Sequence, residues 1–168
     1  GFDWNDLEHL KSFSRPILIF TCIYYAVFNV LIGPITEELF FRGFVLRELL
    51  FNYGWKPIRA SLIVSFLFGV LHLLNVNSYA TWSYAIVQGI CAFAVSFNLC
   101  AIFIKTKSML WCVIIHALIN ITSIGLEYCA NGQQLSLSNF ESIIFLSVSF
   151  IYLISGIKML NSEMVEGK

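Results

Sequence analysis

The stretch PITEELFFRG, residues 34–43, places two adjacent carboxylates and a guanidinium at the end of a long apolar run. Of the 168 residues in the chain, 58% are hydrophobic and 12% are charged. An ordinary soluble domain has about 45–50% apolar and about 25% charged residues. A soluble core of this size cannot bury such a surplus, so the chain is expected to lie in lipid.

Five apolar regions approach the ~20 residues that a helix needs to span a bilayer. None of them alternates apolar and polar residues with a period of two, so they indicate helices and not the strands of a barrel. The sequence therefore predicts an all-α, polytopic transmembrane bundle of about five to six membrane helices, with a catalytic core in its interior. The five regions are residues 16–35, 58–74, 84–104, 108–126 and 143–160.

The polar ends of the chain set the expected domain limits. Residues 1–15 are charged and are interpreted as an interfacial lead-in, residues 16–160 as the membrane core, and residues 161–168 as a polar tail. The chain begins with Gly1 and has no signal-peptide pattern, so we expect it to be a piece of a longer membrane protein.

The distribution of Lys and Arg predicts a topology. Basic residues mark 52–59, 105–107 and the C-terminus, which the positive-inside rule places in the cytoplasm. Lys11 and Arg15 also indicate the cytoplasmic side, so the chain would have to cross outward and return before residue 52. Gly33-Pro34 is the natural place for the chain to turn or kink, and residues 36–51 would then form a short helix that runs inward.

Composition argues against a nucleic-acid partner and against a disulfide framework. The net charge is zero and no basic tract occurs, so nucleic acid is not an expected partner. The five cysteines form no CxxC pair, and most lie in apolar segments, so we expect free thiols and not a disulfide framework. They are Cys22, Cys91, Cys100, Cys112 and Cys129.

The two carboxylates of EELFFR have different expected surroundings. Glu38 and Arg42 are four residues apart on a helix, which is the spacing of an ion pair. Glu37 points about 100° away from Glu38, so it can stay outside that pair and act as a general base. The alternative is an interfacial helix start, in which Thr36 is the N-cap and the two carboxylates favour the positive end of the dipole.

Two histidines stand out in later apolar runs. Phe68 and His72 share one helix face, and so do His116 and Asn120. Charged groups are costly in hydrocarbon, so such residues are candidates for a functional site. The alternatives are an interfacial histidine and hydrogen bonds that join helices.

The charge-based topology places these polar groups at a similar depth on three separate helices. A carboxylate, two imidazoles and an amide at one level can activate a water molecule and stabilise an oxyanion, which is what peptide hydrolysis requires.

The same residues resemble the CPBP intramembrane proteases, which include type II CAAX prenyl endopeptidases and bacteriocin-processing enzymes of the Abi type. The family pattern is EExxxR, then FxxxH, then HxxxN or HxxxD, and it is present in order as EELFFR (37–42), FGVLH (68–72) and HALIN (116–120). Members of this family usually carry further helices before the first motif.

The resemblance implies a role for each motif residue. Glu37 would be the general base, His72 would position or polarise the water, and His116 and Asn120 would stabilise the oxyanion. The residues that would support this site are Glu38, Arg42 and Phe68.

No cofactor is favoured by the sequence. The chain has no HExxH motif. Glu37, His72 and His116 could in principle supply a zinc site of two histidines and one glutamate. We favour a glutamate-type mechanism without metal over this zinc alternative.

Three function classes remain at this point. The first is a multi-pass intramembrane endopeptidase, in the plasma membrane if the chain is bacterial, that acts on a membrane-associated protein or peptide among membrane lipids. Its substrate would be a prenylated C-terminus or a bacteriocin leader. The second is a non-catalytic bacteriocin-immunity or binding protein. The third is a transporter whose polar residues line an ion path.

Overall fold

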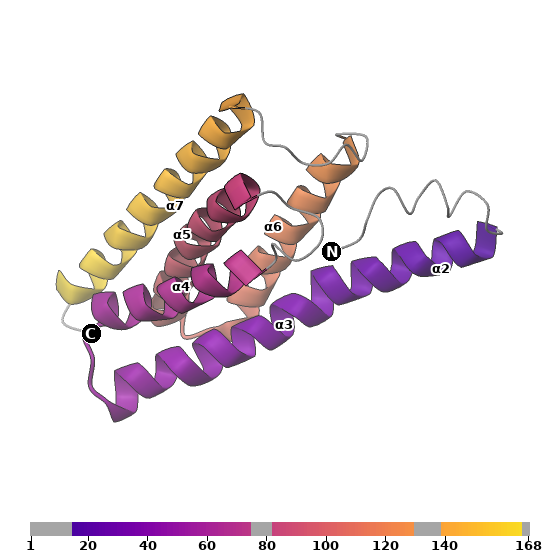
Figure 1. Ribbon diagram of the computed structural model, residues 1–168. Coiled ribbons are helices and arrows are strands. Elements are labelled where there is room, and N and C mark those ends of the chain that lie inside the picture. The colour runs from indigo at the N-terminus through magenta and orange to yellow at the C-terminus, as the bar shows by residue number, and fades with distance from the viewer. Residues whose placement is uncertain (1–14, 75–81, 130–138, 166–168) are drawn as a thin grey trace.

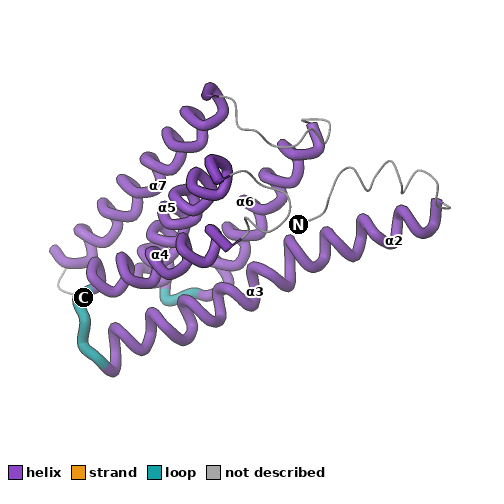
Figure 2. The backbone as a smooth tube through the Cα atoms, viewed as in Figure 1, coloured by secondary structure: helices purple, strands orange, loops and turns teal. Residues whose placement is uncertain are grey.

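A computed structural model describes residues 15–74, 82–129 and 139–165 (Figure 1). All regular secondary structure in these ranges is helical (Figure 2), which confirms the all-α prediction. The lead-in up to residue 14 and the side chains of Cys22 and Cys129 lie outside the described part. In chain order the elements, in which η denotes a π-helix, are α2 (Arg15–Ala26), η1 (Val27–Ile32), α3 (Gly33–Glu38), η2 (Leu39–Leu46), η3 (Glu48–Asn52), α4 (Pro57–Leu73), α5 (Trp82–Thr106), α6 (Met109–Cys129) and α7 (Asn139–Val165).

The first five elements form one continuous helical rod, so the predicted turn at Gly33-Pro34 is wrong (Figure 1). Gly33 is helical, with φ −54 and ψ −63. A proline ring inside an α-helix clashes with a carbonyl of the preceding turn. Here the preceding turn is the wider π-helix η1, which accommodates the ring without breaking the rod.

The predictions of a separate inward helix at 36–51 and of an N-cap at Thr36 are also wrong, because the rod is continuous there. The Thr36 hydroxyl donates back to the carbonyls of Ile32 and Gly33, both at 2.9 Å. Such a contact belongs to the interior of a helix and not to its first residue.

The continuous rod also changes the topology. At about 1.5 Å per residue, residues 15–52 extend well beyond the ~30 Å of a hydrocarbon core. The rod begins at Arg15 in α2 and ends at Asn52 in η3, so these residues are its two ends. The predicted out-and-back path between Arg15 and residue 52 is therefore wrong, and the side of the membrane on which each end lies stays a prediction.

Two of the described helices are long and apolar enough to cross a membrane. They are Trp82–Thr106, with a mean hydropathy of 2.0, and Ile143–Ser162 within α7, with a mean hydropathy of 2.1. Pro57–Leu73 and Met109–Thr122 are apolar but shorter. These helices fit a membrane protein, while the total of five to six spans stays a prediction.

Helix α5 is the centre of the bundle, since α4 and α7 both pack along it (Figure 1). The crossing of α4 and α5 is close because two glycines meet there. A Cβ atom on Gly69 would lie 2.8 Å from the carbonyl oxygen of Gly89, and one on Gly89 would lie 2.8 Å from Leu73 Cδ2. Small residues that let backbones approach are the usual basis of helix packing in membranes.

We expect Gly69→Val to lower the free energy of unfolding by about 1–3 kcal/mol, because the larger side chain forces α4 away from α5. Thermal unfolding of the purified protein in detergent measures this change. Val70→Ala on the exposed side of the same turn is the control and should shift the melting temperature little. Equal effects of the two substitutions would contradict the close crossing.

Candidate active site

Glu38 and Arg42 form a fully buried ion pair on the long helical rod. Both side chains are 0% exposed, and Arg42 Nη1 donates to Glu38 Oε1 at 3.1 Å. The predicted pairing at i,i+4 is confirmed. Because each charge is out of contact with solvent, each depends on its partners for stabilisation.

Arg42 also connects the rod to α4 and α5. Its Nη2 donates to the Ser96 hydroxyl at 2.8 Å and to the Ser96 carbonyl at 3.0 Å. Its guanidinium lies 5.2 Å from the ring centroid of Phe68. Ser96 was missed at the sequence level, because a single serine in an apolar helix carries no signal of its partner.

His116 of α6 lies between the two carboxylates of the motif. Its Nδ1 is hydrogen-bonded to Glu38 Oε1 at 2.8 Å, and its Nε2 lies 3.6 Å from Glu37 Oε2. The His116 side chain is buried, whereas that of Glu37 is 40% exposed. Glu38 is therefore shared by Arg42 and His116, and orients the imidazole besides pairing with the guanidinium.

His72 is oriented by its own helix. Its Nδ1 lies 2.8 Å from the Phe68 carbonyl oxygen. A carbonyl only accepts hydrogen bonds, so Nδ1 carries a proton in this contact and Nε2 keeps a lone pair in the neutral ring.

The Phe68 ring is the packing partner of both histidines. Its centroid is 4.5 Å from that of His72 and 5.9 Å from that of His116. Phe41 packs edge-on against it at 5.0 Å. The predicted contact between Phe68 and His72 is confirmed, and Phe68, which belongs to the buried core, contacts both imidazoles.

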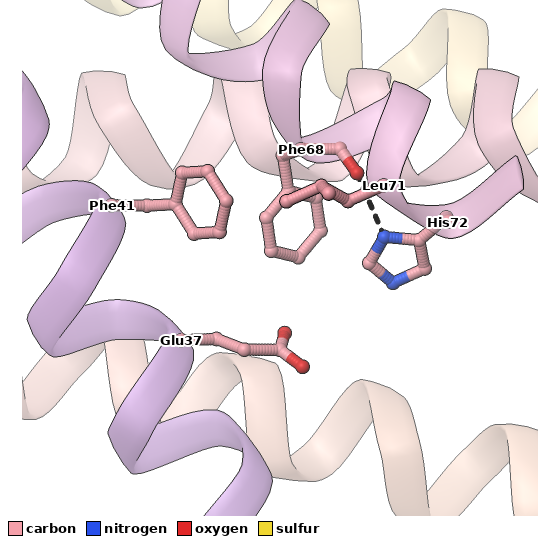
Figure 3. A pocket seen from close by; sticks show the side chains of 5 residues that line it. All are labelled: Glu37, Phe41, Phe68, Leu71 and His72. Atoms are coloured by element: carbon pink, nitrogen blue, oxygen red, sulfur yellow. Dashed lines mark hydrogen bonds between the residues drawn. The ribbon is translucent and has the colours of Figure 1, made fainter. Parts of the chain in front are cut away.

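Glu37 and His72 face one small cavity of about 170 Å³ (Figure 3). In the close view, the carboxylate and the imidazole reach into the same space from the rod and from α4, with the two phenyl rings along one wall. A cavity of this size can hold ordered water beside polar groups. Its lining residues are Glu37, Phe41, Phe68, Leu71 and His72.

Asn120 makes a contact that its motif did not predict. Its Nδ2 donates to the main-chain carbonyl of Asn29, in η1, at 2.8 Å. Asn120 does not line the cavity. The structure thus brings Glu37, His72 and His116 together from three helices, while Asn120 reaches the rod one turn beyond His116.

The zinc alternative is not supported by the donor arrangement. Among the described residues, no three His, Cys, Asp or Glu side chains form a group that could hold a metal ion. Glu37, His72 and His116 therefore do not form a ready three-ligand site. The described cysteines Cys91, Cys100 and Cys112 are free thiols, as expected.

Comparison with known proteins identifies the family to which the chain belongs. Residues 19–122 match the family model of type II CAAX prenyl endopeptidase Rce1-like proteins. This match contains all three motifs and covers more than half of the chain. No curated protein and no solved structure matches the chain. The chain belongs to the Rce1-like family of membrane-embedded proteases, and the resemblance to CPBP proteases is confirmed.

Proposed function

We propose that this protein is a glutamate-type intramembrane endopeptidase that cleaves a prenylated, CAAX-type C-terminus. The observation that carries the proposal is the shared cavity of Glu37 and His72, with His116 beside it. A partly exposed carboxylate that faces an imidazole across a cavity with room for water suits general-base chemistry.

Glu37 is the base in this proposal. A water in the cavity donates to the Glu37 carboxylate and to the Nε2 lone pair of His72, which together hold it for attack on the scissile carbonyl. Glu37 takes the proton as the water attacks and returns it to the leaving amine.

His116 stabilises the oxyanion. To donate from Nε2 while Nδ1 donates to Glu38, the ring must carry both protons. Glu38 Oε1, 2.8 Å from Nδ1, accepts one of these two hydrogen bonds.

Cleavage should be independent of added metal. We expect a chelator to leave the cleavage rate of the purified protein within about twofold of its untreated value, because the base and the oxyanion donor in this account are side chains. The assay compares untreated, chelated and zinc-restored protein. Loss of activity with chelator and its recovery with zinc would contradict the metal-free mechanism.

The substrate class is tested with matched peptides. The purified protein is reconstituted in vesicles and given one CAAX-type peptide with and without its prenyl group, and a bacteriocin leader peptide in parallel. The proposal expects cleavage of the prenylated peptide and little cleavage of the other two. Preferred cleavage of the leader peptide would contradict the CAAX-type substrate and leave the proposed protease activity standing.

A further inference from the structure

The Arg42 guanidinium is divided between two partners, and Glu38 receives only one of its N–H groups. Nη1 donates to Glu38 Oε1 at 3.1 Å, whereas Nη2 donates to Ser96 of α5. Among the described residues, neither Arg42 Nε nor Glu38 Oε2 has a hydrogen-bond partner, although both atoms are buried. The pair therefore lacks the two parallel bonds that an arginine and a carboxylate frequently form.

Ser96 holds the guanidinium in this one-bond arrangement. Its hydroxyl and its main-chain carbonyl both accept from Nη2, at 2.8 Å and 3.0 Å. Because the N–H groups of a planar guanidinium form a rigid fork, fixing Nη2 also fixes the direction of Nη1. Ser96 thus determines how Arg42 approaches Glu38.

Glu38 Oε1 connects this arrangement to His116. The oxygen accepts from Arg42 Nη1 and lies 2.8 Å from His116 Nδ1, so both groups depend on its position. The other ring nitrogen of His116, Nε2, is the atom that lies 3.6 Å from Glu37 Oε2. If Arg42 turned to bind both oxygens of Glu38, the carboxylate would rotate and the imidazole would lose its fixed partner.

We propose that Ser96 is a positioning residue for His116. Its hydroxyl keeps Arg42 from forming two bonds with Glu38, and so keeps Oε1 in place for Nδ1 of the imidazole. The ring then presents Nε2 toward Glu37. Ser96 does not line the cavity, so it acts through the ion pair. The catalytic part of this inference rests on the proposed function, in which Nε2 donates to the oxyanion.

The kinetic test removes the hydroxyl in two ways. We expect Ser96→Ala to lower kcat about tenfold with KM unchanged, because an oxyanion donor that is out of place loses its effect in the transition state. Ser96→Cys keeps the volume of the side chain but offers only a weak acceptor, so its kcat should be as low. Wild-type kcat in either variant would overturn the inference.

The matched control is Ser65→Ala. Ser65 is as fully buried as Ser96, but its hydroxyl donates to the Ser61 carbonyl of its own helix at 2.6 Å. We expect its kcat to stay within about twofold of the wild type, because the substitution leaves the ion pair untouched. Equal losses of kcat for Ser65→Ala and Ser96→Ala would overturn the inference.

A double variant tests whether Ser96 acts through His116. His116→Ala alone should lower kcat by about 10²–10³-fold, as loss of one oxyanion donor does. Adding Ser96→Ala should lower kcat no further, since the ring that Ser96 positions is then absent. Additive losses would overturn the inference.

A readout without catalysis separates this inference from the proposed function. In protein labelled with ¹⁵N-histidine, the His116 Nδ1–H should exchange slowly with solvent in the wild type and in Ser65→Ala, and faster in Ser96→Ala. Its signal is assigned by its absence from His116→Ala protein. The same exchange rate in the wild type and in Ser96→Ala would overturn the inference. If the wild type cleaves no peptide, the proposed function fails, and the exchange rates still decide whether Ser96 positions His116.

Discussion

Glu37→Gln is expected to reduce the cleavage rate by about 10³-fold, within the range of 10²–10⁴ that general-base catalysis contributes. Glutamine keeps the size and hydrogen-bonding capacity of the side chain but cannot take a proton from water. Glu37 is 40% exposed at the cavity, so the substitution leaves no buried charge unpaired. The initial rate of peptide cleavage at saturating substrate measures the effect.

The matched control for Glu37→Gln is Glu48→Gln. Glu48 lies on the same helical rod, away from the cavity, and accepts a hydrogen bond from Asn52 at 2.6 Å. We expect its cleavage rate to stay within about twofold of the wild type, as for a surface substitution of small energetic effect. Wild-type cleavage by Glu37→Gln would show that another group activates the water.

Arg42→Met is expected to lower the free energy of unfolding by about 3–5 kcal/mol, the usual cost of removing one partner from a buried ion pair. Methionine fills much of the volume but leaves the Glu38 carboxylate without its guanidinium. It also removes the two bonds to Ser96 and the contact with Phe68. Unfolding by denaturant titration in detergent measures the change.

A double variant identifies the buried charge as the cause. Glu38→Gln in the Arg42→Met background removes the unpaired carboxylate and should restore part of the lost stability. Its cleavage activity should stay low, because His116 then lacks its negative partner. Arg47→Met, at an exposed position over Phe51, is the control and should change stability by less than about 0.5 kcal/mol. Equal losses for Arg42→Met and Arg47→Met would contradict the account of the pair.

The features predicted from sequence are those that helix geometry alone determines. Glu38 with Arg42, and Phe68 with His72, are neighbours on any α-helix, so their contacts follow from a spacing of four. The rarity of polar groups in apolar runs then indicated Glu37, His72 and His116 together. Ser96 and the Asn29 carbonyl could not be found this way, because their partners lie on other helices and they carry no charge.

The path of the first helix shows where local preference misleads. Glycine followed by proline is typical of a turn, yet the rod continues through Gly33 and Pro34 because a π-helical segment precedes them. The π-helical segment η1 contacts α6, and the hydrogen bond from Asn120 to the Asn29 carbonyl is one of these contacts. Sequence spacing within one helix contains no record of that contact.

The most direct test of the central claim is identification of the product made by the purified wild-type protein. The protein is reconstituted in vesicles, incubated with a prenylated CAAX-type peptide, and the peptide is analysed by mass spectrometry. The account predicts a shortened peptide that ends at one internal bond, and its absence when Glu37→Gln protein is used. If the wild-type protein leaves both the prenylated peptide and the leader peptide intact, the assignment of this site as a protease active site is contradicted.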